Sequence, residues 1–184
     1  MRIVGGKFSG RVIEQPATRT TRPTADRTRQ AVFNILEHAP WSPGLAGARV
    51  LDLFAGSGAL GLEALSRGAS FCLFVETDAG ARGAIRDNIE ALGLFGATRL
   101  HRRDALDLGQ RPAGLNAPFD LVFLDPPYNQ AMGEAAIARL APGGWITPDA
   151  LIVYECAADE TPALSLTLLD ERVYGAAKVL FLRA

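Results

Sequence analysis

Residues 50–69 constrain this chain most, because a short apolar run there leads through glycines into a helical pattern. Residues 50–54 are typical of a strand that is buried on both faces. Leucines then recur among good helix formers as far as Gly68, which predicts a helix with a glycine at its C-terminal end. Between them, the spacing G-x-G-x-x-G is matched by Gly56, Gly58 and Gly61. The stretch predicts the first unit of a nucleotide-binding α/β fold, although such turns also join strands to helices for packing reasons alone.

Two further stretches indicate which ligand is bound. An apolar run over residues 71–75 ends at Glu76, whose carboxylate can accept hydrogen bonds from both hydroxyls of an adenosyl ribose. A third run, residues 119–124, leads into Asp125-Pro126-Pro127-Tyr128. A nicotinamide dehydrogenase needs neither this tetrapeptide nor Asp52, which precedes the glycine turn. The combination favours S-adenosylmethionine over NAD as the cofactor.

The tetrapeptide suits methylation of an exocyclic amine on a nucleobase. Such an amine is a poor nucleophile because its lone pair is delocalised into the ring, and two hydrogen-bond acceptors can pyramidalise it. The candidates are the carboxylate of Asp125 and the carbonyl of Pro126, whose direction Pro126 and Pro127 fix. Tyr128 offers a face on which a flipped base can stack. The alternative is a rigid turn, but ligands of α/β proteins bind at the carboxyl ends of such strands.

Asp104 has the analogous position after a strand expected near residues 98–101. Its carboxylate could accept from an adenine amino group, with the N–H of Ala105 donating nearby. A helix N-cap is an equally good interpretation of Asp104.

The length and composition indicate the size of the domain and exclude several classes of protein. With 184 residues and 48% hydrophobic content, the chain can form one sizeable globular domain. We find neither a membrane-spanning run nor a signal-peptide core, and no Walker-type glycine-lysine motif of an ATPase. Cys72 and Cys156 fall in expected buried strands, which fits reduced thiols and a cytoplasmic location. His38 and His101 lack ligand spacing, so we expect no metal site.

The net charge of −1 hides an asymmetry along the chain. Residues 1–36 carry seven basic and two acidic side chains, a local charge of +5, which leaves −6 for the remainder. A basic segment on an acidic body favours binding of a polyanion such as a nucleic acid. The alternative is an ordinary solvated charged surface.

Strands that alternate with helices predict a mostly parallel sheet with an antiparallel C-terminal edge. We expect a β-hairpin from residues 2–4 and 11–13, and a helix over 25–37 that Thr24 caps. Further helices are expected near 79–92 and 132–140, a strand at 151–155, and a closing hairpin from 164–169 and 178–182. The predicted organisation is an N-terminal extension, residues 1–40, followed by a catalytic domain, residues 41–184.

Several motifs of the chain, taken together, resemble those of a known family. Residues 22–29, Arg-Pro-Thr-Ala-Asp-Arg-Thr-Arg, occur in order with Phe33-Asn34, residues 52–69 and Asp-Pro-Pro-Tyr at 125–128. This combination is similar to the RsmD-like family of bacterial 16S ribosomal RNA guanine-N2 methyltransferases. Gln30 departs from the glutamate that is usual in that pattern.

The resemblance implies a class I S-adenosylmethionine-dependent methyltransferase fold, Rossmann-like, that methylates one guanine N2 in 16S ribosomal RNA or the small subunit. The catalytic residues it implies are Asp125, Pro126, Pro127 and Tyr128. The resemblance also implies that residues 52–58 and Glu76 hold the cofactor. Together with residues predicted from their place after strands, the expected cofactor-binding set is Asp52, Leu53, Phe54, Ala55, Gly56, Ser57, Gly58, Glu76, Thr77, Asp104 and Ala105. The RNA-binding residues are Lys7, Arg11, Arg19, Arg22 and Arg27.

Two alternatives stay open from sequence. A DNA adenine-N6 methyltransferase also methylates an exocyclic amine and could use Asp-Pro-Pro-Tyr in the same way. Such an enzyme usually needs a sizeable target-recognition domain, for which 184 residues leave no room. A noncatalytic nucleotide- or RNA-binding module is the other.

Overall fold

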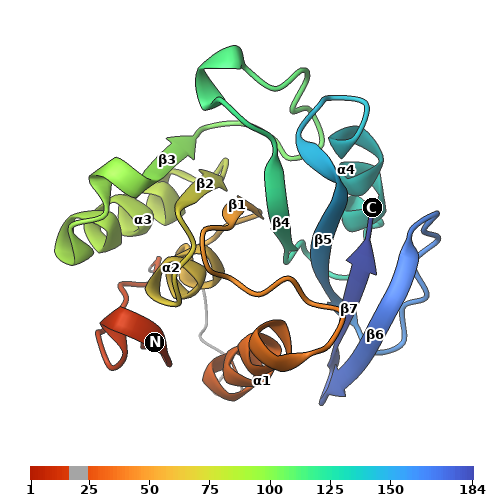
Figure 1. Cartoon of the computed structure of the whole chain (residues 1–184), viewed down its shortest axis with the longest axis horizontal. Helices are drawn as coiled ribbons and strands as arrows, with labels where there is room; N and C mark the ends of the chain where they lie inside the picture. Colours follow the sequence, from red (N-terminus) through yellow and green to blue (C-terminus); the bar gives the residue numbers. More distant parts are fainter. Residues whose placement is uncertain (17–24) are drawn as a thin grey trace.

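The computed structural model describes residues 1–16 and 25–184. Its centre is a seven-stranded sheet in the order β3-β2-β1-β4-β5-β7-β6 (Figure 1). The strands are β1 Arg49–Leu53, β2 Phe71–Val75, β3 Thr98–His101, β4 Phe119–Leu124, β5 Ile146–Ala157, β6 Thr167–Tyr174 and β7 Ala177–Arg183. The helices are α1 Ala25–His38, α2 Ala59–Ser66, α3 Ala79–Leu92 and α4 Met132–Leu140, with short 3₁₀ turns at η1 Gly6–Phe8, η2 Phe95–Ala97 and η3 Ala113–Leu115.

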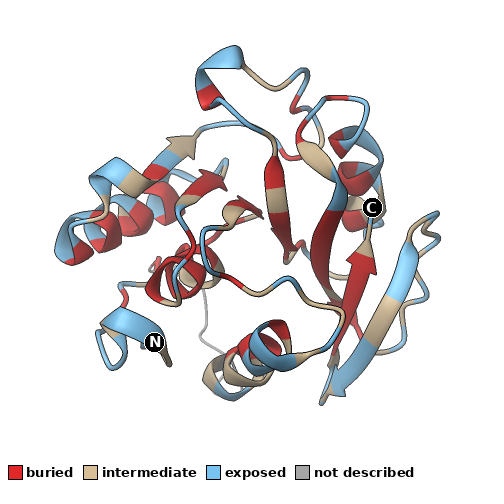
Figure 2. Cartoon of the chain, viewed as in Figure 1, coloured by how far each residue is buried: buried red, intermediate tan, exposed pale blue. Residues whose placement is uncertain are grey.

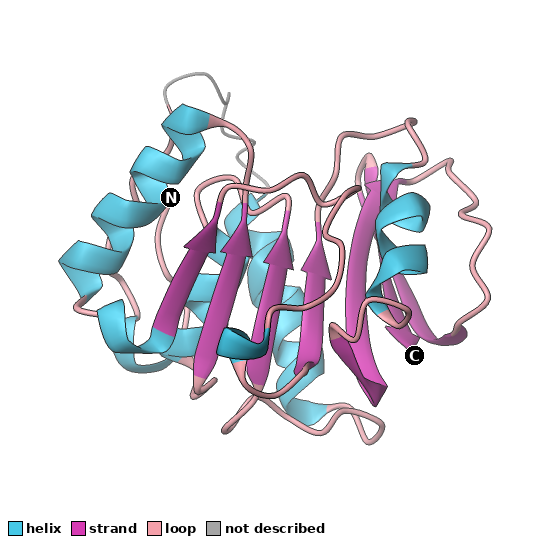
Figure 3. Cartoon of the chain, turned by 90° about the horizontal axis from the view of Figure 1, so that it is seen from above, coloured by secondary structure: helices cyan, strands magenta, loops and turns pink. Residues whose placement is uncertain are grey.

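The first five strands of the chain run parallel, and β7 and β6 add to β5 as an antiparallel edge (Figure 3). This confirms the predicted mostly parallel sheet. Because the crossovers place helices on both faces, alternate residues of each strand enter two different cores. Val50 and Phe74 pack with α1, α2 and α3, whereas Leu51 and Leu73 pack with α4 on the other face. Figure 2 shows the buried strands of the sheet centre.

Several elements have the predicted bounds, and others differ for identifiable reasons. Helices α3 and α4 and strands β3 and β4 match the expected ranges. Strand β5 is longer, since residues 146–150 continue it across a register irregularity against β4. The closing hairpin begins at Thr167 and not at 164, and it turns at Gly175. The expected cap Thr24 lies outside the described residues.

The N-terminal hairpin is reduced to one bridge between Arg2 and Val12, because residues 6–8 form η1 between its arms. Gly6 has φ +73°, and a Cβ there would lie 2.0 Å from the backbone oxygen of Ser66. The turn therefore sits too close to α2 for any side chain at this position. This close approach holds the N-terminal segment, residues 1–16, against the body of the molecule.

Several hydrogen bonds fix the N-terminal segment to α2 and α3. The Val4 N–H donates to Glu63 Oε2 at 2.8 Å, and the Phe8 N–H donates to Ser66 Oγ at 2.9 Å. Asn88 accepts from the Glu14 N–H at 2.7 Å and donates back to the Glu14 carbonyl at 3.1 Å. Among the described residues, no helix combines the length and apolar character needed to cross a membrane.

Candidate active site

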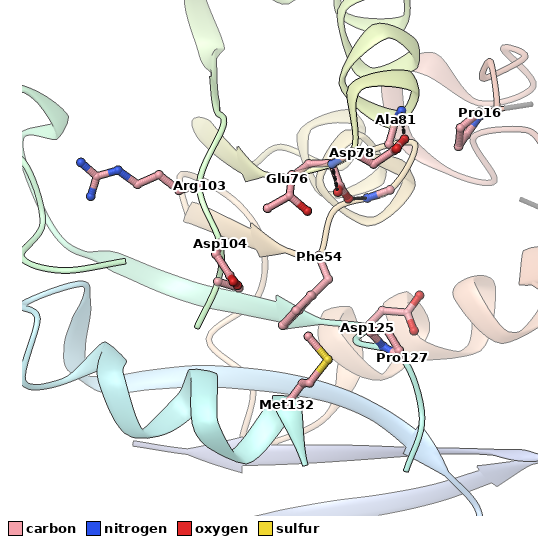
Figure 4. Close-up of a pocket in the computed structure, with 13 residues that line it drawn as sticks. Pro16, Phe54, Glu76, Asp78, Ala81, Arg103, Asp104, Asp125, Pro127 and Met132 are labelled. Carbon is pink, nitrogen blue, oxygen red and sulfur yellow. Dashed lines mark hydrogen bonds between the residues drawn. The ribbon is translucent and has the colours of Figure 1, made fainter. Parts of the chain in front are cut away.

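A cavity of about 360 Å³ lies at the carboxyl ends of β1, β2 and β4, beside the residues that follow β3 (Figure 4). This is the edge at which parallel α/β sheets bind ligands, and its volume is within the range of small-molecule sites. The cavity brings together eight of the predicted site residues: Phe54, Gly56, Glu76, Thr77, Asp104, Ala105, Asp125 and Pro127.

Glu76 follows β2 and is half-buried at the cavity wall. Its Oε2 accepts from the Gly56 N–H and its Oε1 from the Asp78 N–H, both at 2.8 Å. These bonds join the glycine turn to the start of α3 and fix the direction of the carboxylate (Figure 4). Each carboxylate oxygen has two lone pairs, so both can still accept from ligand hydroxyls. Glu76 therefore fits a ribose-binding role.

The glycine turn places Phe54 in the cavity. Phe54 has φ 58°, a left-handed conformation that bulky residues rarely adopt outside functional sites. Its ring points toward Met132, the first residue of α4 (Figure 4). These two side chains supply an apolar wall on which an adenine or a base can rest.

The other predicted residues of the turn do not line the cavity: Asp52, Leu53, Ala55, Ser57 and Gly58. All are buried behind it. Asp52 is 2% exposed, and its Oδ2 accepts from the Gly61 N–H of α2 at 3.0 Å. A Cβ at Gly61 would lie 2.4 Å from the Phe74 ring. Asp52 and Gly61 therefore hold α2 closely against β1 and β2.

Asp104 and Ala105 follow β3 at another wall of the cavity. No helix follows Asp104; its Oδ1 accepts from the Leu106 N–H at 2.9 Å within a turn. The N-cap interpretation is therefore wrong for this residue, and the exposed carboxylate retains further acceptor sites. Burial lowers the pKa of nearby His101, with Arg103 and Arg99 adding to the effect. A histidine whose pKa is lowered stays neutral near pH 7.

The 125–128 loop follows β4 and contributes two residues to the cavity, Asp125 and Pro127. Pro126 is buried, which fixes the backbone between them. The Tyr128 hydroxyl donates to Glu155 Oε1 of β5 at 2.5 Å. The loop thus presents a carboxylate to the same cavity that Glu76 enters from β2.

Sequence reasoning missed five residues of the cavity wall: Pro16, Asp78, Ala81, Arg103 and Met132. Asp78 carried a usable signal, because it caps α3 by accepting from the Ala81 N–H at 2.7 Å, directly after the strand that ends in Glu76. Pro16 carried none, since its approach depends on the docking of the whole N-terminal segment. Arg103 extends away from the other labelled residues, and its Nη1 donates to the Leu108 carbonyl at 2.6 Å (Figure 4).

The predicted RNA-binding residues that the structure describes lie in the N-terminal segment, residues 1–16, and on α1. Lys7 is exposed in η1, and Arg27 is exposed on α1. Arg11 is exposed and donates to the Ala91 carbonyl of α3 at 2.9 Å. Arg19 and Arg22 lie outside the described residues. Within residues 1–16 and 25–184, no group of three or more His, Cys, Asp or Glu side chains is placed to hold a metal ion.

Comparison with known proteins agrees with this geometry. A family model described as conserved hypothetical protein 95 matches residues 1–183. The ribosomal RNA small subunit methyltransferase D of Escherichia coli strain K12 is 35% identical over 178 residues, which are 95% of this chain and 85% of that protein. The solved structure of Escherichia coli yhhF has a TM-score of 0.84 and 35% identity to this chain. The match covers 100% of this chain and 97% of the yhhF chain.

More distant structures share the fold alone. The structure of SMU.776, complexed with SAH, has a TM-score of 0.64 at 19% identity. The match covers 85% of this chain and 49% of the SMU.776 chain. The sheet order and these neighbours establish the class I methyltransferase fold, as the sequence predicted. Because the family model spans almost every residue, this chain belongs to the family of conserved hypothetical protein 95, the RsmD-like family that its motifs resemble.

Proposed function

We propose that this protein transfers a methyl group from S-adenosylmethionine to the exocyclic N2 amine of a guanine in 16S ribosomal RNA. The coarser activity, S-adenosylmethionine-dependent methylation of ribosomal RNA, follows from membership of the family and from the relative that is 35% identical over 95% of the chain. The choice of guanine N2 rests on the resemblance of the sequence motifs. One structural observation carries the proposal: Asp125, after β4, lines the same cavity as Glu76, after β2.

The residues of the cavity fit the cofactor. Glu76 would accept from the ribose hydroxyls, and Asp104 with the Ala105 N–H would hold the adenine edge. The Gly56 N–H is already engaged by Glu76, so in this arrangement the glycine turn contributes mainly a close approach of backbone. S-adenosylmethionine supplies a methyl group on a sulfonium, whose sulfur takes the bonding electron pair when the new bond forms.

The target amine would meet Asp125 and the Pro126 carbonyl. Two acceptors on its hydrogens turn the nitrogen lone pair out of the ring plane and toward the methyl carbon. As the carbon–nitrogen bond forms, the nitrogen becomes cationic and releases one proton toward Asp125 or solvent. No strong base is required, since positioning and exclusion of water supply most of the rate enhancement.

RNA affinity would come from the basic side chains of the N-terminal segment and α1. Lys7, Arg11 and Arg27 are all exposed, so their charges are available to phosphates. Phosphate contacts fix orientation on the RNA without reading sequence, which leaves selection of the base to the 125–128 loop.

The test is methyl transfer from labelled S-adenosylmethionine to unmodified small ribosomal subunits, naked 16S RNA and duplex DNA. We expect label in ribosomal RNA, recovered as N2-methylguanine after digestion. Asp125→Ala should reduce kcat by about 100-fold or more while cofactor affinity changes little, because the acceptor that it removes acts near the transition state. N6-methyladenine in DNA would refute the proposal in favour of the DNA enzyme. Tight cofactor binding without any transfer would favour the noncatalytic module.

A further inference from the structure

The backbone directly after the 125–128 loop has a conformation that its residues do not favour. Asn129 has φ 59° and Ala131 has φ 50°, both in the left-handed region. Asparagine tolerates this region, but alanine rarely enters it, and such residues persist only where the surroundings hold them. Contacts from elsewhere in the fold must therefore keep this stretch in place.

Glu160 supplies such a contact from the turn that follows β5. Its Oε1 accepts from the Asn129 N–H at 2.6 Å and its Oε2 from the Ala157 N–H at 2.5 Å. One carboxylate thus joins the end of the 125–128 loop to the end of a central strand. The bridge is itself anchored, because buried Lys178 of β7 donates to the Glu160 carbonyl.

Glu155 supplies a second contact, to the side chain of Tyr128. The hydroxyl of Tyr128 donates to Glu155 Oε1, and Glu155 is fixed in β5, where it pairs with Val179 of β7. Hydrogen bonds to an ionised acceptor are stronger than neutral ones. A tyrosine held at its hydroxyl keeps its side chain in one direction, as a surface for stacking a flipped base requires.

From these contacts we infer that Glu160 and Glu155 are positioning residues that hold the 125–128 loop in the shape needed to receive the target base. The inference rests on the function proposed for that loop. Neither glutamate lines the cavity, so both act through other residues: Glu160 through the backbone of Asn129, and Glu155 through the hydroxyl of Tyr128.

Substitution by glutamine should affect the two positions differently, because glutamine has only one acceptor oxygen. At Glu160 both carboxylate oxygens accept from N–H groups, so Glu160→Gln must turn its NH₂ toward one donor and break one side of the bridge. At Glu155 a single oxygen accepts from a hydroxyl, so Glu155→Gln keeps that bond, whereas Glu155→Leu loses it. Asp159→Asn is the matched control, because it removes an exposed charge from the same turn.

The experiment measures kcat and KM for methylation of unmodified small ribosomal subunits, S-adenosylhomocysteine affinity by calorimetry, and thermal unfolding. In Glu160→Gln and Glu155→Leu we expect kcat to fall about tenfold or more, the effect of losing a charge-assisted hydrogen bond. Because the loss concerns placement of the base within the bound complex, KM for the subunit and cofactor affinity should change by less than about threefold. Glu155→Gln and Asp159→Asn should keep kcat within about threefold of the unmodified protein.

The outcomes separate this inference from the proposed function. An unmodified protein that does not methylate ribosomal RNA refutes the proposed function and the inference with it. An active protein whose Glu160→Gln and Glu155→Leu variants keep full kcat refutes the inference alone. If Glu160→Gln does not fold, the Glu155 pair decides: equal kcat for Leu and Gln at that position overturns the inference. A parallel loss of cofactor affinity and kcat would mean a role in folding only.

Discussion

Glu63 is the residue whose replacement we expect to destabilise the fold most. It lies on α2 and is 0% exposed, between the side chains of Arg29 from α1 and Arg67, the C-terminal cap of α2. Its Oε1 accepts from Arg67 Nε at 2.8 Å, while its Oε2 accepts from the Val4 N–H and lies 3.4 Å from Arg29 Nε. One carboxylate thus joins two helices and the N-terminal segment.

Glu63→Gln keeps the size of the side chain, but its single carbonyl oxygen can accept from the donors on only one side of the former carboxylate. Its NH₂ group must face either the Val4 and Arg29 donors or the Arg67 donor, and both guanidinium groups lose their buried counter-charge. Removing one partner of a buried ion pair costs about 3–5 kcal/mol. Arg67 retains Glu37 at 2.7 Å, which favours the lower half of that range. For a domain of this size, the unfolding midpoint should fall by on the order of 10 °C.

Urea and thermal unfolding of Glu63→Gln provide the test, with Glu90→Gln as the control. Glu90 is exposed on α3, so its substitution should change the free energy of unfolding by less than about 0.5 kcal/mol. A loss below about 1 kcal/mol for Glu63→Gln would contradict the reasoning. It would mean that water or a shifted arginine compensates for the missing charge.

Three further predictions concern packing, thiol chemistry and RNA affinity. Gly61→Ala should lose roughly 1–3 kcal/mol in urea unfolding because its Cβ has no space against β2, whereas Gly83→Ala, with open space, should gain up to about 1 kcal/mol. Burial raises the pKa of Cys156 to about 11, so a thiol reagent at pH 8 should leave the native protein unlabelled and react after unfolding; rapid native labelling would contradict this. Replacing Lys7 and Arg11 together by alanine should weaken RNA binding and flatten its salt dependence by about 0.7 per lost contact with a single strand. An unchanged slope would show that these side chains only face solvent.

Much of the fold could be predicted because its signals are local. Helix α3 matches the expected range, since Asp78 caps its start and Gly93 with φ 67° ends it. Strand β4 is a continuous apolar run that ends at a proline pair, which allows few other interpretations. The parallel order of the sheet follows from the alternation of strands and helices.

What could not be predicted depends on pairs of residues far apart in the chain. Asp52 is predicted to bind the cofactor from its place before the glycine turn, and nothing in the sequence indicates that its carboxylate also accepts from the Gly61 N–H. The sequence around Glu63 does not indicate two of its partners, the Val4 N–H and Arg29 of α1, because both are distant in the chain. Glu155 lies 27 positions from its partner Tyr128, and Glu160 lies 31 positions from its partner Asn129. Local patterns report periodicity and turns, whereas these contacts are created by the packing of the completed sheet.

The N-terminal segment illustrates why charge and structure have to be considered together. Its charge suggested an extension that the methyltransferase core does not need, yet the Asn88 amide that holds Glu14 also donates to the Ser57 carbonyl in the glycine turn at 3.1 Å. Two residues further on, Pro16 lines the cavity. A segment proposed to bind RNA therefore also contributes to the wall of the cavity that we propose for the cofactor. Its cations Lys7 and Arg11 are exposed and do not line the cavity, so the proposed contact with RNA and the support of the cavity use different groups of the same sixteen residues.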